Sequence, residues 1–159
     1  MIYTVTLNPA LDYIMYPNNL SVGEINRSAR ESLYFGGKGI NVSFILNELE
    51  IPSVATGFIA GFTGDALENA VSAFAKPDFV RLENGITRIN VKLRAENETD
   101  INAAGPEVSK ADINRLFERL EKVLAGDTVV LSGSVPKNMP ADIYENIMKK
   151  LSPRRVKFA

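Results

Sequence analysis

The chain has 159 residues, 45% of them hydrophobic and 23% charged, which is the balance of an ordinary globular domain. The formal net charge is -1 and the 18 Lys and Arg residues are dispersed, so nothing indicates a nucleic-acid partner. The absence of Cys and His excludes disulfides, thiol chemistry and histidine-based catalytic triads, and fits a reducing cytoplasm. No membrane-spanning run and no signal peptide are visible, so we expect a cytoplasmic chain without membrane contact.

The chain begins with a predicted strand at residues 2–7, where β-branched and apolar residues dominate. Asn8 and Pro9 mark a turn, so Asp12 is expected just beyond the carboxyl end of this strand. In open parallel sheets ligands bind at that edge, whereas an aspartate in a turn more often caps the local backbone. Asp12 is therefore the first candidate binding residue, with a turn role as the alternative.

Residues 13–35 predict a two-stranded ribbon that leaves the main sheet. Short β-rich runs at 13–16 and 32–35 enclose a polar stretch at residues 18–24, and the ribbon also carries Arg27. A ribbon rich in Tyr, Ile and Met needs something to cover its apolar side chains. We therefore expect the ribbon to lie over a ligand or against a second chain.

A glycine-rich turn at residues 36–39 directly precedes a helix, which the apolar spacing predicts from about residue 40. Glycine lets a ligand approach the backbone, and a helix N-terminus presents unpaired N–H groups to an anion or a polyhydroxylated ligand. Lys38 adds a cation, and Asn41 adds an amide that donates and accepts hydrogen bonds. The stretch matches neither the P-loop nor the dinucleotide fingerprint, and on spacing alone a plain turn before a core helix is an equal alternative.

The middle of the chain predicts a buried strand at residues 54–59 and a helix that Thr63 or Asp65 caps. Residues 79–102 then predict β-structure with turns. Arg88 lies in a strand-like part of this segment, where a charged residue usually faces solvent. The alternative is an arginine that binds an anion, because its planar guanidinium suits phosphate.

The clearest predicted helix begins at Ser109, which forms a capping-box pair with Asp112, and its apolar face continues to residue 124. An apolar run at residues 128–131 predicts a strand buried on both sides. The sequence Ser-Gly-Ser-Val-Pro follows at residues 132–136, again at the edge where ligands bind.

Pro140 is expected to open a further helix at its first turn, with apolar residues facing inward to Leu151. Residues 156–159 predict the start of another strand. Because a β-α-β unit interrupted there is an unusual domain end, we expect the sequence to be incomplete.

Five sequence blocks, in this order, resemble the ribokinase-like sugar kinases known as the PfkB family. They are residues 4–12 (TVTLNPALD), 36–43 (GGKGINVS), 57–64 (GFIAGFTG), 87–92 (TRINVK) and 130–136 (VLSGSVP). The resemblance extends over the whole chain and is closest to the 1-phosphofructokinase and tagatose-6-phosphate kinase branches. It implies an α/β fold: a ribokinase-like, three-layer α/β/α sheet domain of which residues 1–159 form the N-terminal portion. A small β-sheet lid would be inserted at approximately residues 13–35 and 86–102.

The resemblance also implies two groups of substrate-binding residues. The sugar and its hydroxyls would be held by Asp12, Gly36, Gly37 and Asn41. The phosphate already on the substrate would be held by Lys38 and Arg88, with Arg27 as a further helper.

The implied activity is ATP- and Mg²⁺-dependent phosphorylation of fructose 1-phosphate to fructose 1,6-bisphosphate. Tagatose 6-phosphate is the alternative substrate, and a catalytically inactive fragment that binds sugar phosphate is the alternative function. The family's Gly-Ala-Gly-Asp segment, which supplies the general base and the anion hole, does not occur in this sequence. We therefore expect no catalytic residue here and no turnover by this chain alone. The family's lid often pairs with a second copy, which implies a homodimer.

Overall fold

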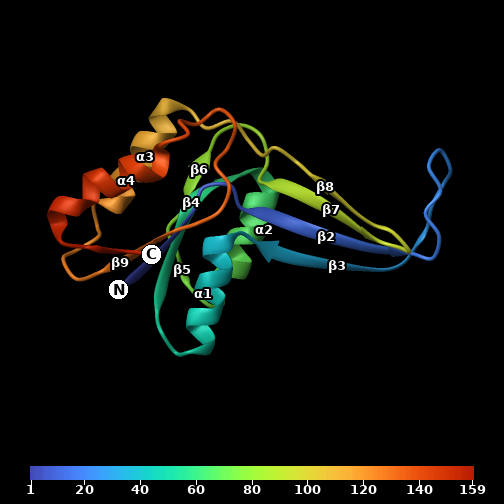
Figure 1. The fold of residues 1–159 in the computed structure, drawn as a ribbon, viewed down its shortest axis with the longest axis horizontal. Helices are drawn as coiled ribbons and strands as arrows, with labels where there is room; N and C mark the ends of the chain where they lie inside the picture. Colours follow the sequence, from blue (N-terminus) through green and yellow to red (C-terminus); the bar gives the residue numbers. More distant parts are fainter.

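The computed structural model describes residues 1–159 and contains a six-stranded main sheet and a separate four-stranded sheet (Figure 1). The main sheet has the order β10-β9-β1-β4-β5, and β6 also pairs with β4. All of its pairings are parallel. Its strands are β1 (Ile2–Thr6), β4 (Ser53–Ala60), β5 (Lys76–Pro77), β6 (Val80–Leu82), β9 (Thr128–Leu131) and β10 (Lys157–Phe158).

Helices cover both faces of the main sheet. The helices are α1 (Lys38–Glu48), α2 (Gly61–Val71), α3 (Lys110–Leu120) and α4 (Ile143–Leu151), followed by the 3₁₀ helix η1 (Ser152–Arg154). In β4 every residue is buried, and alternate side chains enter different cores: Phe58 packs with α3 and α4, and Ile59 packs with α1 and α2. This alternation produces the predicted three-layer α/β/α arrangement. None of the helices has the length and apolar composition needed to cross a membrane.

The four-stranded sheet, here called the side sheet, projects away from the main sheet (Figure 1). It consists of β2 (Ala10–Pro17), β3 (Ser28–Gly36), β7 (Arg88–Arg94) and β8 (Glu98–Asn102) in the order β3-β2-β7-β8. Strands β2 and β7 are parallel, and the outer pairs are antiparallel. The pairing of β2 with β7 joins two segments that lie far apart in the sequence.

Asp12 does not lie in a turn, which was the alternative that the sequence left open for it. Strand β2 already begins at Ala10, so Asp12 is the third residue of a strand, and its backbone pairs in register with Tyr34 and Asn90. The carboxylate therefore has a fixed direction on one face of the side sheet.

Helix ends differ from the predictions at α2, α3 and α4. Helix α2 begins at Gly61 without a side-chain cap, because the Thr63 hydroxyl donates to the Thr87 carbonyl (2.8 Å) and Asp65 pairs with Arg81. Helix α3 ends at Leu120, before the predicted apolar face does. Helix α4 begins at Ile143, because the residues after Pro140 form a turn first.

Candidate functional site

A polar cavity of about 220 Å³ lies where the main sheet meets the side sheet. It is bordered by the ends of β1 and β9, the starts of β2 and β7, and the N-terminus of α1. Its lining residues are Thr6, Asn8, Ala10, Asp12, Gly37, Lys38, Asn41, Arg88, Asn90, Gly133 and Ser134. This position, at the carboxyl ends of parallel strands, is where open α/β sheets bind ligands.

The N-terminus of α1 is held open toward this cavity. Gly37 precedes the helix with φ 143°, and no side chain caps this helix end. A Cβ atom on Gly37 would lie 2.6 Å from Thr6 Cγ2, so only glycine fits here. The Thr6 hydroxyl also accepts the Ile40 N–H at 3.1 Å, which anchors the first turn to β1. The uncapped helix end carries a partial positive charge that favours an anion.

Asp12 is positioned by the side sheet. The Asn90 Nδ2 group donates to Asp12 Oδ1 at 2.8 Å, and Lys92 Nζ lies 4.0 Å from Asp12 Oδ2. On the other side, a Cβ atom on Gly36 would lie 3.2 Å from Asp12 Oδ2. The small residue at position 36 therefore leaves room for the carboxylate, whose second oxygen can accept hydrogen bonds from a ligand.

Arg88 is half-buried and is held by neutral groups. Its Nε donates to the Asn8 carbonyl (3.2 Å), and its terminal nitrogens lie 3.5 Å from the Ala103 carbonyl and from Ser134 Oγ. Burial lowers the pKa of the Arg88 guanidinium, and the charge of Asp12 opposes this effect. Since an arginine stays protonated in proteins, the site holds a permanent cation.

Neither Arg88 nor Lys38, the other cation of the cavity, forms an ion pair within the chain. Asp12 is the only acidic residue in the lining. A cavity that combines two cations without ion-pair partners and a helix N-terminus is suited to an anionic ligand such as a phosphate.

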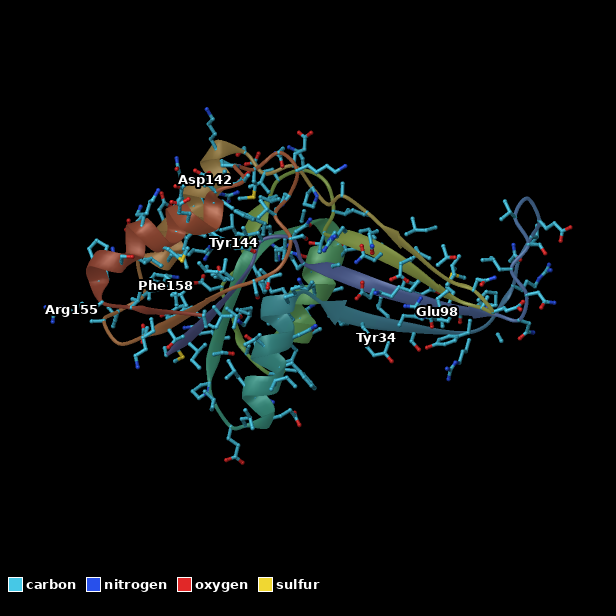
Figure 2. The ribbon with its side chains drawn as sticks, viewed as in Figure 1. Tyr34, Glu98, Asp142, Tyr144, Arg155 and Phe158 are labelled. Carbon is cyan, nitrogen blue, oxygen red and sulfur yellow. The ribbon has the colours of Figure 1, made fainter.

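The loop after β9 is fixed against α4. Tyr144 of α4, labelled in Figure 2, donates its hydroxyl to the Gly133 carbonyl at 3.2 Å. Burial raises the pKa of Tyr144 to about 12, so the phenol remains a neutral donor at physiological pH. This contact positions Gly133 and Ser134 at the cavity.

Five of the predicted binding residues line the cavity together: Asp12, Gly37, Lys38, Asn41 and Arg88. Gly36 adjoins them through its contact with Asp12. Arg27 lies elsewhere, because it is exposed in the segment that joins β2 to β3 at the far end of the side sheet (Figure 1). Sequence reasoning placed Ser134 in a segment at the ligand-binding edge, but it did not single out Asn8 or Asn90 as binding residues. The signal for Asn90 was its spacing, since it follows Arg88 by two residues and therefore shares its face of the strand.

A larger cavity, of about 490 Å³, lies beside the N-terminus of α3. It contains none of the predicted residues. Its Asp112 and Arg115 pair with each other, and Asn138 is bound to the backbone of Val108. Because these polar groups already have partners within the chain, this cavity is a weaker candidate for a ligand site.

Comparison with known proteins identifies the family. Residues 5–153 match the family described as pfkB family carbohydrate kinase. The chain belongs to this family. It is 45% identical over 153 residues to a 1-phosphofructokinase of Bacillus subtilis (strain 168), covering 92% of this chain and 48% of the relative. It is 34% identical to a D-tagatose-1-phosphate kinase of Bacillus licheniformis, covering 99% of this chain and 52% of the relative.

Solved structures agree with this assignment. A candidate phosphofructokinase from Staphylococcus aureus is 36% identical and superimposes with a TM-score of 0.93, covering 99% of this chain and 52% of that one. Phosphofructokinase-2 from Escherichia coli in complex with fructose-6-phosphate gives a TM-score of 0.89 at 22% identity, covering 99% of this chain and 53% of that one. The predicted family and the ribokinase-like fold are thus confirmed. The chain spans about half the length of these relatives.

Proposed function

We propose that this chain supplies the sugar-phosphate site of an ATP-dependent pfkB family kinase that converts fructose 1-phosphate to fructose 1,6-bisphosphate. The observation that carries the proposal is the meeting of Lys38 and Arg88 with Asp12 and Asn41 in one polar cavity. Cations pair with a phosphate dianion, while carboxylate and amide groups pair with hydroxyls. The relatives named 1-phosphofructokinase support the choice of substrate.

In this proposal the residues of the chain bind and orient the acceptor. Arg88, Lys38 and the N-terminus of α1 hold the phosphate, and Asp12 and Asn41 hold the hydroxyls. Positioning matters because phosphoryl transfer depends mainly on orientation and electrostatic stabilisation. The side sheet acts as a lid that excludes water, which competes with the sugar as acceptor.

ATP would supply the transferred phosphoryl group, and Mg²⁺ would neutralise its charge. The chain contains no group of three or more His, Cys, Asp or Glu side chains that could hold a metal ion. The proposal therefore assigns no metal ligand to this chain and concerns the sugar phosphate. We assign no catalytic residue in this chain.

Two alternatives follow from particular observations. The relative named D-tagatose-1-phosphate kinase favours a tagatose phosphate as the second candidate substrate. The side sheet also exposes Leu33, Tyr34 and Ile101, which favours pairing with a second copy of the chain. Arg27 lies in the segment between β2 and β3, so it would help to bind phosphate only if this far end of the side sheet came close to the polar cavity.

Calorimetric titration of the purified chain with fructose 1-phosphate tests the proposal. We expect Arg88→Ala to weaken binding about 10- to 100-fold, because a hydrogen-bonded charge is removed. Arg81→Ala is the matched control, since Arg81 is exposed and pairs with Asp65 and Glu68 outside the cavity. Equal affinity for fructose and fructose 1-phosphate would contradict the proposal.

Catalysis is tested separately by ADP release in the presence of ATP, Mg²⁺ and fructose 1-phosphate. We expect no turnover by the 159-residue chain, because it lacks the family's general-base segment. ADP formation that depends on the sugar phosphate would overturn this expectation. If a full-length form of the protein is active, comparing its turnover rates on fructose 1-phosphate, tagatose 1-phosphate and tagatose 6-phosphate would distinguish the candidate substrates.

A further inference from the structure

Asn90 lies beside Asp12 in the cavity, where one end of its side-chain amide positions the Asp12 carboxylate. It is buried, with 7% of its surface exposed, and it lines the cavity from β7. The register of β2 and β7 places Asn90 directly opposite Asp12. Its Nδ2 group donates to Asp12 Oδ1 at 2.8 Å.

The other end of the Asn90 amide has no partner. The oxygen Oδ1 is fully buried and accepts no hydrogen bond within the chain. The two ends of the amide are distinguished by chemistry, because an ionised carboxylate can only accept, so the nitrogen must face Asp12. The orphaned atom is therefore an acceptor. Buried polar groups almost always have partners, and this orphaned atom belongs to a residue that lines the cavity, so a ligand that donates a hydrogen bond would satisfy it.

The neighbouring side chains do not supply that donor. Lys92, the nearest lysine on the same strand, contacts Asp12 and Asp100. Arg88 is directed to the Asn8 carbonyl and to the loops that carry Ala103 and Ser134. A sugar hydroxyl fits the requirement, because it donates one hydrogen bond and is neutral.

We propose that Asn90 determines sugar specificity, with its Oδ1 accepting a hydrogen bond from one sugar hydroxyl while Asp12 accepts from another. This inference rests on the proposed function. The side-by-side acceptors on β2 and β7 select a ligand with two hydroxyl donors. A deoxy sugar leaves one acceptor buried without a partner, and sites of this kind reject such analogues strongly.

The test uses fructose 1-phosphate, its 3-deoxy and 4-deoxy analogues, and inorganic phosphate, each titrated against the chain. Asn90→Ala should weaken fructose 1-phosphate binding about five- to tenfold, the usual effect of losing one such hydrogen bond. With one of the deoxy analogues, Asn90→Ala should reduce the affinity by less than about twofold, because the hydroxyl that Asn90 would contact is already absent from that ligand. Binding of inorganic phosphate should not change. Asn69→Ala, on the exposed face of α2, is the matched control.

A comparison with Asp12→Ala separates direct recognition from positioning. If Asn90 contacts the sugar, the loss of affinity caused by Asn90→Ala should shrink for one deoxy analogue, and the loss caused by Asp12→Ala should shrink for the other. If the losses caused by both variants shrink for the same deoxy analogue, Asn90 acts only by holding Asp12 and the inference is wrong.

A second measurement applies if Asn90→Ala does not fold. In unmodified protein labelled with ¹⁵N-asparagine, the side-chain amide signal of Asn90 should shift with fructose 1-phosphate and shift less with one of the deoxy analogues. Identical shifts with all three sugars would overturn the inference. Failure of the unmodified chain to bind fructose 1-phosphate would overturn the proposed function and this inference with it. Normal binding that Asn90→Ala leaves unchanged would overturn the inference alone.

Discussion

At the scale of single residues, the cavity depends on small side chains beside a threonine. Thr6 uses its hydroxyl to hold the first turn of α1, and its methyl group occupies the space that a side chain on Gly37 would need. Gly37 also has φ 143°, a conformation that other residues rarely adopt. Its glycine identity thus follows from both backbone conformation and packing.

Gly37→Ala is therefore expected to destabilise the chain and to weaken phosphate binding. Backbone strain of this kind costs about 1–3 kcal/mol, and displacement of the Thr6 methyl adds to it. Gly23→Ala is the control, because Gly23 has φ 86° but no atom within 4 Å of the added Cβ. Urea unfolding should show a larger loss for Gly37→Ala, and phosphate titration should respond to that variant alone. Equal effects of the two variants would show that the contact with Thr6 is unimportant.

At the scale of elements, the N-termini of α1 and α3 are satisfied in different ways. Helix α3 closes its own end: the Ser109 hydroxyl accepts the Asp112 N–H at 3.2 Å, and Asp112 Oδ2 accepts the Ser109 N–H at 3.0 Å. Helix α1, preceded by Gly37, has no side-chain cap. The helix that faces the cavity is thus the one whose end remains available to a ligand.

Ser109→Ala is expected to lower the free energy of unfolding by about 1 kcal/mol, the usual effect of losing an N-cap. The loss follows from the Asp112 N–H, which would no longer have its acceptor. Ser72→Ala is the matched control, because the exposed Ser72 hydroxyl only contacts the Asn69 carbonyl near the end of α2. Chemical unfolding of both variants measures the difference. A loss that is the same for both would contradict the capping role.

The same cap predicts a pH dependence. Burial raises the pKa of Asp112, but hydrogen bonds from Ser109 and Arg115 outweigh this effect and hold the pKa below its usual value. A carboxylate with a lowered folded-state pKa stabilises the fold above its unfolded pKa, and this contribution is lost as the pH falls through the folded pKa.

The stability difference between the unmodified chain and Asp112→Asn should therefore be present at pH 7 and should decrease as the pH falls below about 4, the ordinary pKa of an aspartate. Glu118→Gln, which alters an exposed carboxylate of the same helix without an ion-pair partner, is the control and should show little difference. Unfolding curves between pH 7 and pH 3 provide the measurement. A constant difference for Asp112→Asn across this range would contradict the prediction.

At the scale of the whole molecule, the sequence predicted the α/β class and most strands and helices, because the apolar periodicity is local. The family resemblance, and not its local position, assigned Arg88 to phosphate. Asp12 and Lys38 were candidate binding residues from their positions beside a strand end and a glycine turn. Residue types and local spacing carry this information.

The remaining features depend on contacts between distant segments. The register of β2 with β7 brings Asn90 to Asp12, and no local pattern specifies that register. The missing cap of α2 has the same origin, because the Thr63 hydroxyl is directed to Thr87. Arg27 lies in the segment between β2 and β3, and its position depends on how far the side sheet extends from the main sheet.

Thr87 connects the two sheets of the molecule. It is buried, with 1% of its surface exposed, and directly precedes β7. Its hydroxyl accepts the Ala60 N–H at 2.9 Å, and its own N–H donates to the Ala60 carbonyl at 2.8 Å. The end of β4 in the main sheet is thus tied to the start of β7 in the side sheet, and Arg88 is the next residue.

Thr87→Val removes one hydroxyl at almost constant volume and is expected to loosen this connection. The buried Ala60 N–H loses its acceptor, which costs about 1–3 kcal/mol, and Arg88 should be held less firmly. Hydrogen exchange should therefore become faster in β7 and β8 than in β1 and β4, and fructose 1-phosphate should bind more weakly. Thr99→Val, on the exposed strand β8, is the matched control. If Thr87→Val accelerates exchange equally in both sheets, the residue stabilises the whole fold and does not specifically orient the side sheet over the cavity.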